Sequence, residues 1–330
     1  MEKNKDELEK SISAVKKLPG VGEATLKKLI NAGFSSLEAI AFTPPRILMD
    51  ETGIGDKTAI KLIHSALDML GIKKKKSAFE IWKERASVNR LTTRSFNLDD
   101  CLYSGKKDAP GGLEPGTLTE LFGEFRTGKT QLCHQLCVNA QLPFRDGGLE
   151  GNAYYIDTNN TFRSERIVQM AEALDLDIDK TLKRIIVSRA YNSDHQMDLV
   201  RKAERIIRAH RIKLLVIDNL TNFFISEYPG RGLLDSLRSL LRSHLNHLHL
   251  LTDIFPGLVV VYVNQVEIKP DVFYGNPIIP LGDEVLAHAA TTRIFIRKGK
   301  GEQRLAKIVK SPYLPEAEAI FSVTEMGIRD

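Results

Sequence analysis

Apolar and polar residues alternate in blocks over the part of the chain after about residue 80. Continuous apolar runs such as 214–217 and 258–263 are typical of strands that are buried on both faces. Segments such as 130–142 and 164–174, which lie between the apolar runs, are predicted to be helices. Strands that alternate with helices predict an α/β fold with a mostly parallel sheet covered on both faces.

The predicted strands share a short apolar centre, and they cover residues 116–123, 152–157, 184–190, 213–221 and 258–266. The segment before residue 116, from about residue 103, is rich in Gly, Pro and Lys and is expected to be a surface loop.

The first 70 residues follow a different pattern, in which short helices are separated by turns that contain glycine. Residues 18–33 and 52–67 repeat one another, each with an apolar residue between two glycines and then an amphipathic helix. The glycines are Gly20 and Gly22 in one repeat and Gly53 and Gly55 in the other. The first amides of each helix then point outward, where they suit a DNA phosphate. The repeat predicts tandem helix-hairpin-helix motifs, and a plain packing module is the alternative.

The segment GEFRTGKT matches the phosphate-binding pattern G-x-x-x-x-G-K-[ST] and stands between a predicted strand and a predicted helix. Its amides would surround the phosphates, Lys129 would reach the β- and γ-phosphates, and the Thr130 hydroxyl would hold Mg²⁺. The expected ATP-binding residues of this segment are Gly123, Glu124, Phe125, Arg126, Thr127, Gly128, Lys129, Thr130 and Gln131.

Two further strands end in polar residues that suit this site. Asp218 ends an apolar run and is placed for the Mg²⁺ water shell. Asn264 and Gln265 end another apolar strand, where they either face the γ-phosphate or bond the strand end. ATP and Mg²⁺ are therefore the expected cofactors.

These motifs divide the chain into three parts. Residues 1–70 are the expected helix-hairpin-helix DNA-binding domain, and residues 91–330 are the expected ATPase core. Residues 71–90, with a lysine run at 73–76, form a basic linker and assembly segment that should be solvated and extended.

Composition adds only a little to the prediction of binding partners and cellular location. The net charge of +5 permits nucleic-acid binding but does not require it. Cys133 and Cys137 are four residues apart on a predicted helix and should be core residues, and the low number of cysteines suits a reducing compartment. The chain has no apolar run of about 18 residues, so we expect no membrane association and a cytoplasmic, nucleoid-associated location.

The order and spacing of these motifs resemble the RadA-type DNA strand-exchange recombinases of archaea, within the RecA-like superfamily. The resemblance covers residues 18–330 and includes the segments YIDTNNTFRSERI, PDVFYGNP, AHAATTRIFIRKGKGEQR and SPYLPEAEAIF. It implies a RecA-like P-loop ATPase core behind a small all-α domain. It also implies an ATP-dependent filament or ring that coats single-stranded DNA and pairs it with homologous double-stranded DNA.

The resemblance further implies roles for particular residues. Nucleotide would lie between neighbouring subunits, with Arg166 against the adenine. Segments 231–242 and 266–284 match the two DNA-binding loops of the family. The DNA-binding residues expected in these loops are Arg231, Arg238, Arg242, Lys269 and Gly282.

The chain departs from the family at its catalytic glutamate, whose position is occupied by Asn159, followed by Asn160 in place of a glycine. An asparagine can bond a water molecule but cannot accept its proton. Weakened hydrolysis is therefore expected, although Gln265 is retained.

Other departures concern assembly and DNA. Lys75 stands where the family has an anchoring phenylalanine, and a lysine does not fill an apolar pocket without a free-energy cost. Phe79 is the nearby alternative anchor. Lys310 replaces an aspartate, and in a filament it would meet the γ-phosphate of an adjoining subunit. The DNA loops read Leu237–Arg238 and Gly282–Asp283 in place of Arg-Gln and Gly-Gly.

Two functions remain open at this point. One is an ATP-dependent recombinase with weakened hydrolysis, which we favour. The other is a non-hydrolysing relative that binds ATP and DNA and acts as an accessory, or mediator, protein.

Overall fold

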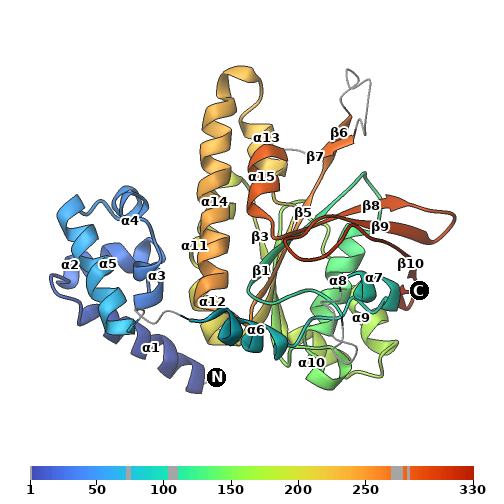
Figure 1. Ribbon diagram of the computed structural model, residues 1–330, viewed down its shortest axis with the longest axis horizontal. Helices are drawn as coiled ribbons and strands as arrows, with labels where there is room; N and C mark the ends of the chain where they lie inside the picture. Colours follow the sequence, from blue (N-terminus) through green and yellow to red (C-terminus); the bar gives the residue numbers. More distant parts are fainter. Residues whose placement is uncertain (1, 72–75, 103–110, 269–277, 281–282) are drawn as a thin grey trace.

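The computed structural model describes residues 2–71, 76–102, 111–268, 278–280 and 283–330. Its centre is a nine-stranded sheet with the order β11-β10-β9-β8-β1-β5-β4-β2-β3. A small helical domain lies at one side of this core (Figure 1). The predicted α/β fold with a mostly parallel sheet is therefore confirmed, as is the all-α domain in front of it.

Six neighbouring strands of the sheet are parallel, and three strands at one side run antiparallel. The parallel strands are β1 (Thr117–Phe122), β2 (Asn152–Asp157), β3 (Ile185–Arg189), β4 (Ile212–Asp218), β5 (Val259–Asn264) and β8 (Thr292–Lys298). The antiparallel strands are β9 (Gln303–Lys310), β10 (Glu318–Thr324) and β11 (Gly327–Arg329). A separate hairpin is formed by β6 (Val266–Ile268) and β7 (Ile278–Pro280).

Helices cover both faces of the sheet, because successive side chains of the central strands point to opposite faces. Tyr154 packs in one apolar cluster and Tyr155 in the other. One face carries α7 (Phe96–Cys101), α8 (Lys129–Asn139), α9 (Ser164–Glu172) and α10 (Ile178–Lys183). The other face carries α11 (Ser193–Arg201), α12 (Ala203–His210), α13 (Asn222–Glu227), α14 (Leu234–Ile254) and α15 (Asp283–Ala289).

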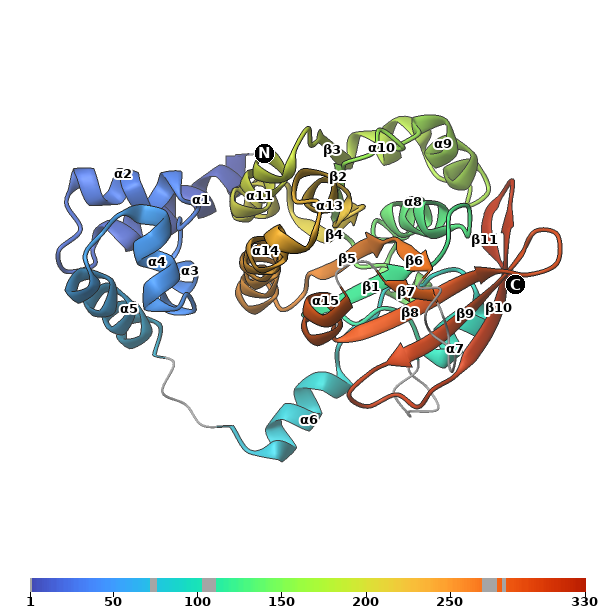
Figure 2. The same cartoon turned by 90° about the horizontal axis from the view of Figure 1, so that it is seen from above.

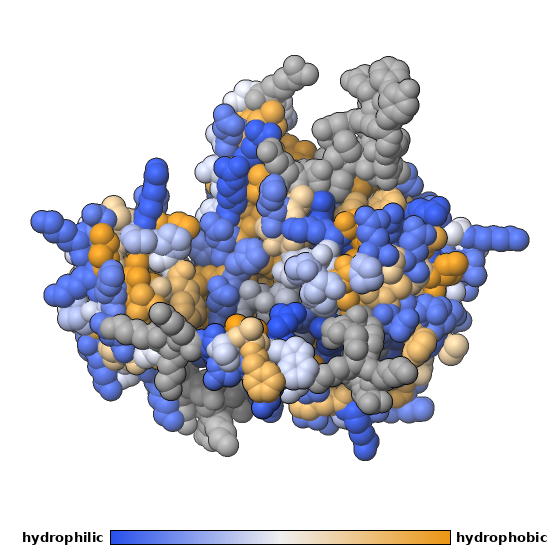
Figure 3. Space-filling model, viewed as in Figure 1, coloured by the Kyte–Doolittle hydropathy of each residue, from blue (hydrophilic) through white to orange (hydrophobic). Residues whose placement is uncertain are grey.

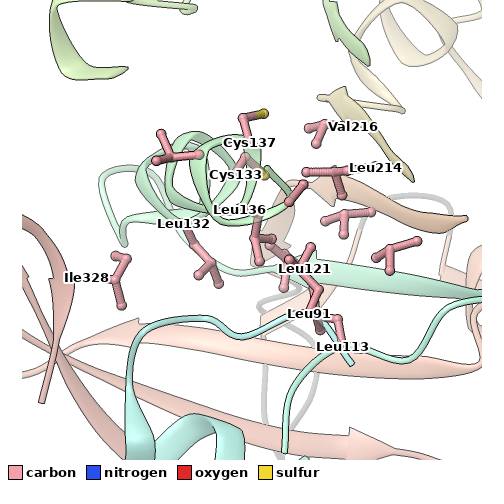
Figure 4. Packing of buried hydrophobic residues seen from close by; sticks show 14 of the residues in the cluster. Leu91, Leu113, Leu121, Leu132, Cys133, Leu136, Cys137, Leu214, Val216 and Ile328 are labelled. Carbon is pink, nitrogen blue, oxygen red and sulfur yellow. The ribbon is translucent and has the colours of Figure 1, made fainter. Parts of the chain in front are cut away.

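The packing of α8 against the sheet fixes the start of that helix. Cys133 and Cys137 lie in this core and are fully buried (Figure 4), which confirms their expected role as small apolar residues. Burial raises the pKa of both thiols.

The helical domain has its own core. It consists of α1 (Glu2–Lys16), α2 (Glu23–Asn31), α3 (Leu37–Ala41), α4 (Pro45–Thr52) and α5 (Asp56–Leu70). In each repeat the second glycine caps a helix, Gly22 for α2 and Gly55 for α5. The first glycines, Gly20 and Gly53, have positive φ values of 95° and 63°.

This domain packs against α12 and α14 of the core, and Figure 2 shows it beside α14. Leu250 and Ile254 of α14 join its apolar cluster. Beside them, His247 Nε2 lies 3.2 Å from Glu51 Oε2, and both side chains are nearly buried. The helical domain therefore packs on the carboxyl-terminal half of α14.

Helix α6 (Ala78–Ala86) connects the domains and has no buried residue. Its amino end is closed by a capping box between Ser77 and Glu80. Phe79 and Trp82 stack with their ring centroids 5.9 Å apart, and each is more than half exposed. Apolar side chains mark the surface over this helix (Figure 3). Among the described residues, no helix is both long enough and apolar enough to span a membrane.

Candidate nucleotide site

A cavity of about 640 Å³ lies at the carboxyl ends of β1, β2, β4 and β5. Ligands of parallel α/β sheets bind at this edge, because the loops that follow the strands meet there. Most of the P-loop lines the cavity, together with Asn159, Asp218 and Gln265. The structure therefore brings together residues that are far apart in the sequence but were assigned to one site.

The P-loop joins β1 to α8 and leaves no space for a side chain at its first residue. A Cβ atom at Gly123 would lie 2.0 Å from the carbonyl oxygen of Ile296. Lys129 Nζ donates to the carbonyl oxygens of Gly123 at 2.8 Å and Glu124 at 2.7 Å. Burial lowers the pKa of Lys129 to about 8. The lysine is thus held in the loop before any phosphate binds.

The expected Mg²⁺ ligands contact each other directly. Thr130 Oγ1 donates to Asp218 Oδ2 at 2.6 Å, and Tyr155 OH donates to the same oxygen at 2.8 Å. Burial raises the pKa of Asp218, and these two hydrogen bonds oppose that effect. No cluster of three or more His, Cys, Asp or Glu side chains that would suit a metal occurs in the described parts of the chain. A hydroxyl, one carboxylate and phosphate oxygens do suit Mg²⁺, which takes few protein ligands.

The loop after β2 is organised by Asp157. Its carboxylate accepts hydrogen bonds from the backbone amides of Asn159, Thr161 and Phe162, each at 3.1 Å. Asn160 has a φ of 58°, a conformation that asparagine tolerates better than most residues. The Asp157 carboxylate thus bonds the amides of its own loop, and it is not among the described residues that line the cavity.

Asn159 itself lines the cavity and is partly exposed. Among the described residues that line the cavity, Asp218 carries the one carboxylate. Asn159 and Gln265 therefore add amide groups, and no second carboxylate, to the described lining of the cavity.

The position of His134 is not predicted by the sequence analysis. It lies one turn into α8, where its Nδ1 donates to the carbonyl of Thr130 at 2.7 Å and its Nε2 accepts from the amide of Arg163 at 3.1 Å. Its ring packs between Tyr155 and Phe162. Burial lowers the pKa of His134 to about 4, so the ring is neutral and its tautomer is fixed. A single polar ring inside the apolar run LCHQLC was the available signal.

The opposite wall of the cavity comes from the antiparallel strands. Arg304 of β9 and Val323 of β10 line it, and Gln131 lies at the start of α8. Arg166 is near this end but does not line the cavity. Its guanidinium bonds Gln131 Oε1 at 2.5 Å and the carbonyl oxygens of Thr324 and Glu325.

Lys310 lies away from the cavity of its own chain. Its Nζ donates to the carbonyl oxygens of Ala287 at 2.5 Å and Ala290 at 2.8 Å, at the carboxyl end of α15. A lysine is favourable there because carbonyl groups at a helix end carry partial negative charge.

The candidate DNA residues lie on separate surfaces. Gly20, Gly22, Gly53 and Gly55 are all exposed on the helical domain. Arg242 is exposed on α14 and lines a second cavity of about 470 Å³, beside α15, while Arg238 is half-buried with Asp235 at 3.9 Å. Arg231 begins the 3-10 turn Arg231–Leu233, and its side chain lies outside the described set. Lys75, Lys269 and Gly282 lie outside the described residues.

Comparison with known proteins gives matches to both parts of the chain. Residues 84–330 match the family model described as Rad51, and residues 12–68 match a SAM-like helix-hairpin-helix tandem. The chain is 46% identical to the DNA repair and recombination protein RadA of Aeropyrum pernix. That match covers 97% of this chain and 98% of the relative.

Proposed function

The chain belongs to the Rad51 family, and on this premise we propose that it is an ATP-dependent recombinase that holds ATP much longer than it cleaves it. In this proposal it binds single-stranded DNA and promotes homologous pairing and strand exchange with a duplex. The observation that carries the proposal is the nucleotide cavity, which retains its cations and its Thr130–Asp218 pair but has Asn159 at the expected catalytic position.

ATP binding is supported by the charges of the cavity. Lys129 and the amides at the start of α8 are already oriented, so little order would be lost on binding a polyphosphate. Thr130 and Asp218 would hold Mg²⁺, which neutralises phosphate charge when bound.

Slow hydrolysis follows from the amide side chains that line the cavity. Asn159 and Gln265 can orient a water molecule, but neither accepts its proton at neutral pH. Asp157 is bound by three amides of its own loop, and no second carboxylate takes that role among the described residues that line the cavity.

DNA binding is supported by two sets of groups. The exposed turns before α2 and α5 present helix amides to solvent, which suits phosphate without regard to sequence. Arg238 and Arg242 of α14 add cationic side chains to a separate surface of the core. A strand bound there would be contacted mainly through its backbone.

Self-association is supported by α6. A nine-residue helix without a buried residue does not form stably on its own, so its stacked Phe79 and Trp82 favour a contact with another copy of the chain. In such an assembly we place Lys310 near the γ-phosphate of the adjoining copy, after it leaves the carbonyl oxygens of α15.

A residue of the segment before this helix favours a second function, an accessory protein that binds ATP and DNA without forming long filaments. Lys75 stands in place of the anchoring phenylalanine, and a lysine opposes burial in an apolar pocket of another copy. Both functions share the nucleotide site and differ in assembly.

Electron microscopy with single-stranded DNA, with and without ATP, tests the proposal. Regular filaments that require ATP, together with formation of joint molecules from homologous DNA, are expected for the recombinase. Monomers or small rings without joint molecules would contradict it and favour the accessory function.

A further inference from the structure

Arg304 occupies an unusual position for a surface-strand arginine. It comes from β9, yet its side chain reaches the amino end of α8, where a Cβ atom added at Gly128 would lie 3.7 Å from Arg304 Nε. Its Nη1 donates to the carbonyl oxygens of Gly301 at 3.2 Å and Gln303 at 2.7 Å. Its Nε is buried and has no hydrogen-bond partner in the part of the chain that the structure describes.

The cavity that Arg304 lines has an excess of positive charge, with Asp218 as the one carboxylate of its described lining. The amino end of α8 carries the positive end of the helix dipole, and Lys129 and Arg126 line the same cavity. The hydrogen bonds that hold Arg304 within the described residues go to neutral carbonyl groups. An anion in the cavity would stabilise a guanidinium that lies near a positive helix end and has a buried donor unused.

The order of the strands indicates which part of a nucleotide would lie beside Arg304. The P-loop follows β1. On one side of β1 are β5, β4 and β2, which supply Gln265, Asp218 and Asn159; on the other side, beyond β8, are β9 and β10, which supply Arg304 and Val323. Since Thr130 and Asp218 mark the metal and the terminal phosphates, the nucleoside end lies toward β9 and β10.

We propose that Arg304 is a nucleotide-binding residue that contacts the phosphate next to the ribose, the α-phosphate, while Val323 packs beside the sugar. The inference rests on the proposed ATP site and adds a residue from the carboxyl-terminal strands to it. The C-terminal strands thereby take part in nucleotide binding directly, beyond completing the sheet. Because ADP and ATP share the α-phosphate, Arg304 contributes equally to the binding of both.

Calorimetry with ADP and with ATP, in the presence of Mg²⁺, tests this assignment in the full-length chain. Arg304→Gln removes the charge but keeps groups that bond the carbonyls of Gly301 and Gln303. We expect affinity for both nucleotides to fall by about tenfold, with their ratio unchanged, and the salt dependence of binding to decrease. Arg304→Lys should lose less affinity for both nucleotides. Arg297→Ala is the matched control, because Arg297 is exposed on β8 in the same hairpin and does not line the cavity.

The outcomes are distinct. Affinity of Arg304→Gln within twofold of the wild type, or a loss confined to ATP, would overturn the inference and leave the proposed function intact. A wild-type chain that binds neither nucleotide would overturn both. Should Arg304→Gln prove unfolded by circular dichroism, Arg304→Lys decides: an equal loss of threefold or more for both nucleotides supports the contact, and unchanged affinity contradicts it.

Discussion

The P-loop and the hairpin turns offer the same chemical groups to an anion, the free backbone amides at the start of a helix, but they are built differently. At Gly123 the core approaches so closely that a Cβ atom would lie 2.0 Å from a backbone oxygen. At Gly53 a Cβ atom would meet nothing within 4 Å, and the residue is exposed.

The difference teaches that the two glycines are required for different reasons. Gly123 is required by the close approach of β8 in addition to its positive φ of 153°, so the packing of the core sets the shape of the P-loop. Gly53 is required only by its backbone angle, so its turn is free to adapt to DNA. Changes in the first region should therefore affect nucleotide strongly, and changes in the second should affect DNA moderately.

Loss of the Lys129 cation should give the largest effect. Lys129→Ala is expected to weaken ATP binding by about 100-fold or more, because charge-assisted contacts to the β- and γ-phosphates are lost. Nucleotide-free DNA binding at low salt should stay within twofold, since the hairpin turns do not touch this residue. Calorimetry and fluorescence anisotropy measure the two affinities. Equal ATP affinity in variant and wild type would remove the basis of the comparison.

Restoring a carboxylate at position 159 should have the second largest effect. Asn159→Glu is expected to raise DNA-stimulated ATP turnover by at least about tenfold, because a positioned general base typically contributes about 10²–10⁴-fold. Phosphate release with saturating single-stranded DNA is the measurement, and Asn159→Gln, which has the length of glutamate without its charge, is the control. If the wild type already turns over as fast as Asn159→Glu, Asn159 does not lie in the path of the attacking water.

A pH effect should distinguish the buried cation from exposed ones. Burial lowers the pKa of Lys129 from 10.5 to about 8, so its protonated fraction declines above pH 8 in the free protein. A polyphosphate binds the protonated form, so binding takes up a proton above pH 8. Affinity should be nearly flat below pH 8 and fall by up to about tenfold per pH unit above it. Lys129→Arg should lack that decline between pH 8 and 10, and an equal decline would refute the assignment.

The hairpin turn should give the smallest effect. Gly53→Ala strains a positive φ and displaces the amides before α5, so DNA affinity at low salt should fall by about threefold to tenfold. Gly71→Ala is a close control: Gly71 has a φ of 64° against 63° at Gly53 and equally open surroundings, but it follows α5. Equal losses in both variants would mean that the turn is only a structural element.

The sequence was sufficient for the fold and for the residues of the P-loop, because both depend on local pattern. The apolar runs of β4 and β5 and the G-x-x-x-x-G-K-T spacing are visible without any contact information. His134 and Arg304 were not predictable in this way. One acts through a backbone amide 29 residues later, and the other reaches the P-loop from a strand more than 170 residues away. Asp157 ends β2, but its three bonds to loop amides depend on a turn that the sequence pattern does not specify.

Helix α14 has a geometric consequence for any DNA that binds on both parts of the molecule. Arg238 and Leu250, where the helical domain packs, are twelve residues apart on this helix, which is about 18 Å along its axis. Helix α14 therefore fixes the spacing between these two surfaces. With the helical domain fixed on its far end by Leu250, Ile254 and the Glu51–His247 pair, a duplex held by the hairpins would be offset from a strand held by the core by a set distance. That distance along α14 is comparable to the length of about five base pairs of B-form DNA.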